Sequence, residues 1–212
     1  MHQPLVVLII LILLFVISII TWFLLKNIFL LGTGILFLLL FLFTLYFFRD
    51  PARQAPDVKN IIIAPADGRV VDITYDQQLL SFDEKFIKIS IYLSLWDVHI
   101  NRIPISGEII FLQYKKGEFY PAYKSKASQK NESNVIGIKT KIGKVFVKQI
   151  AGIIARRIDC TIKKGEKVTM GQRFGIIKFG SRVELFLPPS VELTVSVDDY
   201  LRGGETIVGK IL

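Results

Sequence analysis

The 212-residue sequence is poor in the side chains that build redox and metal centres, with one cysteine and two histidines. A single cysteine forms no internal disulfide and cannot supply a cysteine-based metal cluster. The sequence also lacks the glycine-rich phosphate loop of nucleotide-binding proteins and any cluster of histidine, cysteine and carboxylate at zinc spacing. We therefore expect neither nucleotide-driven chemistry nor a bound metal.

Hydrophobic residues and positive charge are abundant instead. Hydrophobic residues make up 51% of the chain and the mean hydropathy is +0.48, which excludes a disordered protein and favours a membrane segment. Lys and Arg number 27 against 18 Asp and Glu, a formal net charge of +9. This excess indicates an anionic partner, either lipid headgroups or nucleic acid.

Two uncharged runs, 4–25 and 28–48, occupy the N-terminus, and only Lys26 and Asn27 separate them. Each run is as long as the ~20 residues that cross a bilayer core as a helix. We predict a transmembrane helical hairpin over residues 1–48. A cleaved signal peptide is the alternative, but the start of the chain carries no basic residue and a second apolar run follows at once.

The charges that flank the two runs predict their orientation. Arg49, Arg53 and Lys59 follow the second run, whereas the loop carries Lys26 alone. The positive-inside rule therefore places residues 49–212 on the cytoplasmic face of the cell membrane. Nine lysines in 115–148 either form a solvated face or approach anionic lipid. Because the hairpin already sets the location, we favour the membrane and expect no nucleic-acid partner.

Residues 49–212 carry the pattern of a β domain. In 86–95, Ile87, Ile89, Ile91, Leu93 and Leu95 alternate with other side chains, as in a half-buried strand. Further short strands are expected at 69–75, 107–114, 135–140, 144–150, 182–187, 191–197 and 206–212. No long helical period follows residue 48, so we predict a mostly β fold, a compact sandwich-like or barrel-like catalytic domain.

Three positions in this domain could carry chemistry. His99 is the one internal histidine and follows the clearest strand, which makes it the candidate acid–base group. Asp67 precedes Gly68 in an ordinary turn signal, or it orients His99. Gly180-Ser181 also reads as a turn, but a serine hydroxyl can attack the preceding carbonyl where a base is near.

Eight short motifs in one order resemble the phosphatidylserine decarboxylase family, in particular its short branch, which includes archaeal archaetidylserine decarboxylases. Each motif alone is weak, and the order over residues 48 to 188 makes the resemblance specific. The motifs are Phe48-Arg-Asp-Pro51, Pro65-Ala-Asp-Gly68, Val98-His-Ile-Asn-Arg-Ile-Pro104, Tyr114-Lys-Lys-Gly-Glu-Phe119, Asn131-Glu-Ser-Asn134, Gln149-Ile-Ala-Gly152, Ala155-Arg-Arg-Ile158 and Lys178-Phe-Gly-Ser-Arg182.

The resemblance implies a zymogen that cuts itself between Gly180 and Ser181. The products would be a β-subunit, 1–180, and an α-subunit, 181–212, headed by a pyruvoyl group made from Ser181. By motif, Ser181, His99 and Asp67 correspond to the family's Asp–His–Ser arrangement, with His99 as base and Asp67 as its orienter. The pyruvoyl ketone would form a Schiff base with the serine headgroup of an aminophospholipid and accept electrons as carbon dioxide leaves.

The same resemblance implies cations for the phosphate and carboxylate of the substrate, and no metal. Candidates in or beside the motifs are Arg102, Arg156, Arg157 and Arg182. One position departs from the family: where the long branch has a second histidine, this chain has Trp96. The proton donor for decarboxylation is therefore His99, a water molecule or another group.

Rival functions remain open at this point. A lipoyl- or biotinyl-type carrier or interaction module would share the Gly-rich turns of 163–175, but Lys178 lacks the flanking residues of a modified lysine. A membrane-anchored serine protease of the signal-peptidase type, or a purely structural adaptor, would leave the chain uncut at position 180. Neither the choice between ester- and ether-linked lipid nor the oligomeric state, a homodimer included, follows from the sequence.

Overall fold

A computed structural model describes residues 3–79, 83–118, 120–121, 127–152, 157–178 and 181–211. The chain divides into two compact units, one ending at Asp50 and the other beginning at Pro51. Each unit has its own internal contacts and is described by itself.

The first unit is a pair of packed helices, α1 (Gln3–Leu25) and α2 (Ile28–Phe47). Lys26 takes a left-handed backbone conformation with φ 51°, and the Asn27 side chain accepts a hydrogen bond from the Phe29 N–H at 3.0 Å, which caps α2. The helices approach closely at Gly34, where a Cβ would lie 3.1 Å from a side-chain carbon of Ile19. The predicted helical pair is confirmed, and by length and composition both helices could cross a membrane.

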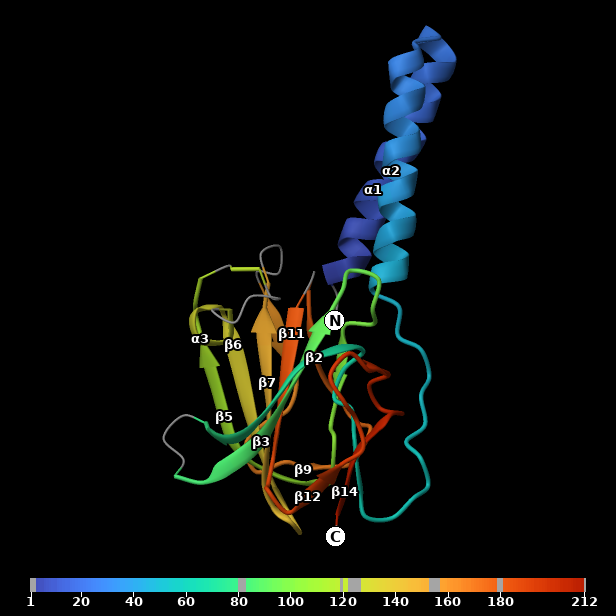
Figure 1. The fold of residues 1–212 in the computed structure, drawn as a ribbon. Coiled ribbons are helices and arrows are strands. Elements are labelled where there is room, and N and C mark those ends of the chain that lie inside the picture. Colours follow the sequence, from blue (N-terminus) through green and yellow to red (C-terminus); the bar gives the residue numbers. More distant parts are fainter. Residues whose placement is uncertain are drawn as a thin grey trace. The chain divides into compact units, whose positions relative to one another are not determined.

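The second unit is built on a curled, antiparallel eight-stranded sheet (Figure 1), with strand order β13-β2-β3-β11-β7-β6-β5-β9. The strands are β2 (Gly68–Gln78), β3 (Lys85–Leu93), β5 (Gly107–Lys115), β6 (Ser133–Thr140), β7 (Gly143–Ala151), β9 (Lys167–Val168), β11 (Ser181–Leu187) and β13 (Tyr200–Leu201). The mostly β, barrel-like prediction is confirmed.

Two three-stranded sheets and a short helix complete this unit. One sheet has the order β1-β14-β12 and the other β4-β10-β8. These elements are β1 (Ile61–Ile63), β14 (Ile207–Ile211), β12 (Val191–Leu193), β4 (Ile100–Arg102), β10 (Arg173–Ile177), β8 (Ile158–Cys160) and α3 (Ala127–Lys130). The predicted strand at 191–197 is shorter than expected, because β12 ends at Leu193.

Strand β11 lies at the centre of the large sheet, between β3 and β7, and all seven of its residues are buried. Val183, Leu185 and Leu187 join the main hydrophobic core. Arg182 and Glu184 alternate with them and face the other side of the sheet, where Phe186 joins a second, smaller cluster. The strand that begins with the predicted nucleophile is therefore the most enclosed element of the sheet.

Candidate active site

Ser181 is the first residue of β11, where its backbone pairs with Leu93 of β3 and Ala151 of β7. The residue is fully buried, and its hydroxyl has no hydrogen-bond partner among the described residues. Buried hydroxyl groups ordinarily find a partner, and Ser181 shares the lack of one with Ser90 of β3 among the described residues. Gly180, the other half of the predicted cleavage site, lies outside the described residues.

His99 is also fully buried, just before β4. Its Nδ1 lies 2.9 Å from the main-chain carbonyl oxygen of Asp97. A carbonyl oxygen only accepts hydrogen bonds, so Nδ1 carries the proton in this contact. In the neutral ring, Nε2 then holds the lone pair, which is the form that a general base requires.

Two backbone connections link the region around Ser181 to the region around His99. Leu93, the β3 partner of Ser181, leads through a turn at Ser94–Asp97 directly to His99. On the other side, the Ile177 N–H donates to the His99 carbonyl oxygen at 3.4 Å, four residues before Ser181. The turn before His99 is therefore continuous with the strand that pairs with Ser181.

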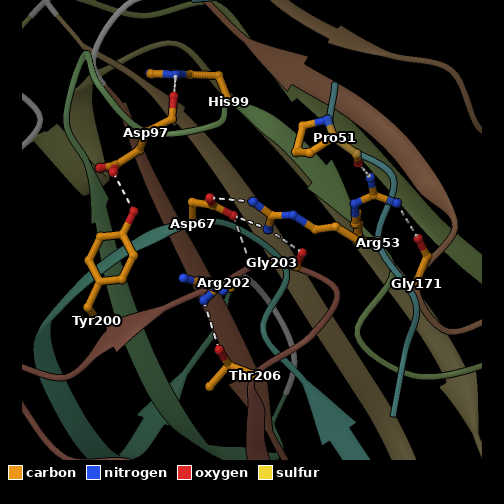
Figure 2. A network of polar contacts seen from close by, with 11 residues as sticks. Pro51, Arg53, Asp67, Asp97, His99, Gly171, Tyr200, Arg202, Gly203 and Thr206 are labelled. Carbon is orange, nitrogen blue, oxygen red and sulfur yellow. Dashed lines mark hydrogen bonds and ion pairs between the residues drawn. The ribbon is translucent and has the colours of Figure 1, made fainter. Parts of the chain in front are cut away.

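Asp97 organises the turn before His99, and Figure 2 shows its contacts with His99 and Tyr200. One carboxylate oxygen accepts from the Ser94 N–H at 2.7 Å and from the Ser94 hydroxyl at 2.8 Å, and the other accepts from the Tyr200 hydroxyl at 2.6 Å. Burial and the hydrogen bond to Asp97 raise the pKa of Tyr200 above its usual value. Sequence reasoning missed both residues, because 103 positions separate them.

Asp67, the predicted orienter of His99, is buried and bound elsewhere. Its two carboxylate oxygens accept from the guanidinium of Arg53, and one of them also accepts from the Gly203 N–H at 2.8 Å (Figure 2). None of its hydrogen bonds within the described residues goes to His99. The hydrogen bond to Asp67 raises the pKa of Arg53. A catalytic role for Asp67 stays a prediction.

The four predicted anion-binding arginines lie in different settings. Arg102 is buried and donates to the carbonyl oxygens of Pro51 and Gly171, each at 3.1 Å. Arg157 is exposed, and Arg156 lies outside the described residues. Arg182 is buried on the sheet face opposite the main core. The structure therefore does not gather the four into one cluster among the residues it describes.

A buried polar network surrounds Arg182. Its guanidinium lies 3.3 Å from the Ser128 hydroxyl and 3.9 Å from the Glu184 carboxylate, and the Ser128 hydroxyl donates to Glu184. Lys148 donates to the Ser128 carbonyl oxygen, and burial lowers the pKa of this lysine. The two cations, Arg182 and Lys148, and the Glu184 carboxylate thus lie close to Ser128 of α3. Of these residues, Arg182 directly follows Ser181 in the chain.

Among the described residues no group of three or more histidine, cysteine, aspartate or glutamate side chains could hold a metal.

Comparisons with known proteins show the family of this chain. The family model for phosphatidylserine decarboxylase matches residues 40–209. A phosphatidylserine decarboxylase proenzyme of Carboxydothermus hydrogenoformans is 45% identical over 179 residues, which cover 84% of this chain and 84% of that protein. Proenzymes of the same description from Wolbachia pipientis wMel and Chlorobium limicola are 45% and 42% identical, over 85% and 81% of this chain and 80% of each relative. The chain belongs to the phosphatidylserine decarboxylase family, a family of carboxy-lyases.

Proposed function

We propose that the chain is a membrane-bound, pyruvoyl-dependent decarboxylase that converts phosphatidylserine or archaetidylserine to the ethanolamine phospholipid and carbon dioxide. Membership of the family supports the reaction class. The observation that carries the site assignment is the Ser181 hydroxyl, which is fully buried and has no hydrogen-bond partner among the described residues, on a strand end joined to the His99 turn.

The first step of the proposal is self-cleavage. His99 Nε2 accepts the proton of the Ser181 hydroxyl, whose oxygen attacks the Gly180 carbonyl carbon, and the amide becomes an ester as the Ser181 nitrogen is released. Loss of the Ser181 α-proton then breaks the ester and leaves a carboxylate on Gly180 and a dehydroalanine at 181. Water converts that residue to a pyruvoyl group and ammonia. One water is consumed and one ammonia leaves.

The residues present fit this chemistry. Asp97, through its carbonyl oxygen, holds the proton on His99 Nδ1, so Nε2 is the nitrogen that moves protons at Ser181. Ser181 is fully buried between β3 and β7, which shields its hydroxyl from water. When present, the pyruvoyl group supplies an electron sink for the charge left by the departing carboxylate.

Substrate binding and location complete the proposal. Arg102, Arg156, Arg157 and Arg182 remain the proposed partners for the phosphate and carboxylate of the lipid. The hairpin of 1–48 anchors the decarboxylase domain, 49–212, with that domain on the cytoplasmic face. The product chains, 1–180 and 181–212, stay together as subunits.

Intact mass spectrometry of the detergent-solubilised protein tests the proposal. We expect two chains divided between residues 180 and 181, the smaller one blocked at its N-terminus and lighter by one ammonia than the serine-headed peptide. The Ser181→Ala variant should remain a single chain and produce no ethanolamine lipid from a serine lipid. Asp67→Asn and His99→Asn report whether these two side chains act in cleavage. A wild-type protein that stays whole on long incubation with lipid contradicts the proposal.

A further inference from the structure

We propose that Trp96 inserts into the headgroup layer of a phospholipid bilayer and holds the mouth of the active site against it. The inference rests on the proposed function for the identity of the substrate. It concerns an aromatic rim, defined as Trp96 and Tyr200, beside the turn that leads to His99.

In the chain, Trp96 lies between Leu93, whose backbone pairs with Ser181, and His99. The turn Ser94–Asp97 is closed by a hydrogen bond from the Asp97 N–H to the Ser94 carbonyl oxygen at 3.1 Å. It starts directly after Leu93, whose backbone pairs with Ser181, and ends two residues before His99. The indole is therefore carried by the short connection between the partner strand of the nucleophile and the base.

The turn holds this large side chain outward. Trp96 is 65% exposed, whereas Asp97, Val98 and His99 beside it are buried. The Asp97 carboxylate accepts three hydrogen bonds that fix the conformation of the turn. The backbone that carries the exposed Trp96 ring is therefore held in place. Tyr200 contributes the second exposed ring, 53% exposed, with its hydroxyl tied to Asp97 (Figure 2).

The chemistry of these side chains selects a bilayer as the partner. Tryptophan and tyrosine combine an apolar ring with one polar group, and both are enriched where lipid headgroups meet hydrocarbon. The serine headgroup is only a few bonds long, and Ser181 is fully buried. A headgroup that reaches Ser181 while its acyl chains stay in the bilayer brings the rim of the site into the headgroup layer.

Fluorescence of Trp96 gives a direct test, because Trp22 is the other tryptophan of the chain. In the Trp22→Phe protein, Trp96 should emit at shorter wavelength in vesicles of phosphatidylcholine and phosphatidylserine than in detergent-free denaturant. Phosphatidylcholine brominated near the headgroup should quench the Trp96 fluorescence. The matched control is Trp22→Phe with Trp96→Phe and Tyr75→Trp. Tyr75 is 62% exposed on β2, toward the end of the β2–β3 ladder away from Ser181, and a tryptophan there should escape quenching.

Kinetics supply the second readout. For Trp96→Ala, the ratio of activity on vesicles to activity on a short-chain, water-soluble phosphatidylserine should fall about tenfold, because partial burial of one large ring in the interface is lost. Tyr75→Ala should keep the wild-type ratio. An unquenched Trp96, or an unchanged ratio in Trp96→Ala, overturns the inference.

The two proposals fail in different ways. Quenching of Trp96 can be measured in the uncleaved Ser181→Ala protein, where no decarboxylation takes place. Quenching without cleavage of the wild-type chain would support the membrane contact and contradict the decarboxylase. Cleavage without quenching would do the reverse.

Discussion

At the scale of single residues, Asp97 connects the two sides of the candidate site. Its carbonyl oxygen receives the His99 Nδ1 proton and its carboxylate receives the Tyr200 hydroxyl. Under the proposed cleavage these belong to different product chains, because Tyr200 follows residue 180. The pair therefore keeps the base in position across a break in the backbone.

We expect Tyr200→Phe to lower the free energy of unfolding by ~1 kcal/mol, a hydrogen bond to a charged group reduced for the exposure of Tyr200. Since the native state raises the pKa of Tyr200, it holds that proton more tightly than the unfolded chain. The stabilisation is then complete below the unfolded pKa of about 10 and declines as the pH rises above it. Urea unfolding of the variant in a Ser181→Ala background, which keeps one chain, measures this.

Tyr75→Phe is the control for this experiment, because Tyr75 is an exposed tyrosine on the same sheet. It should change the stability by less than about 0.5 kcal/mol at any pH. A Tyr200→Phe difference that persists undiminished well above pH 10 would show that the hydroxyl does not provide the stabilisation.

The sequence predicts candidate residues where the prediction depends on residue type and local order. His99 is the one internal histidine and the motif order indicates Ser181, and the roles of both stay predictions. The partners of Asp67 and Asp97 were not predictable, because Gly203 and Tyr200 come from more than a hundred residues away. Long-range contacts of this kind depend on the strand order of the sheet, which alternation within a strand does not encode.

At the scale of elements, the position of β11 determines whether the two chains of the proposed cleavage would stay together. It pairs with β3 at seven positions and with β7 at six, and every one of its side chains is buried. We therefore expect the cleaved 181–212 chain to stay bound to the 1–180 chain through size-exclusion chromatography at nanomolar protein concentration. Denaturant should be needed to separate them. Loss of the small chain on simple dilution would contradict this.

The central strands were predictable, whereas several of the short strands were not. The alternation of 86–95 corresponds to β3, Lys85–Leu93, and 144–150 corresponds to β7, Gly143–Ala151. The strands β4, β8 and β10 escaped prediction, since three to five residues carry too little pattern. The short strand β4 directly follows His99. The sequence therefore predicted the long strands around the site, but it did not predict the short strands beside His99.

At the scale of the whole molecule, each of the two units has its own set of contacts. We expect a protein lacking residues 1–50 to be monodisperse without detergent, to keep its β-type circular dichroism and to unfold cooperatively. The removed helices expose most of their apolar side chains, whereas the core of the second unit lies wholly within that unit. Size-exclusion chromatography and thermal unfolding measure this, and an aggregated product would contradict it.

Because β11 is enclosed in the sheet, the protein would fold readily only before the proposed cleavage. The strand reaches its place between β3 and β7 while it is covalently joined to the rest of the chain, when its effective concentration is high. Under the proposed cleavage before residue 181, an unfolded molecule would have to recover its central strand by a bimolecular encounter. A chain cleaved as proposed would therefore keep its structure through slow unfolding alone, and it would not recover once it had unfolded.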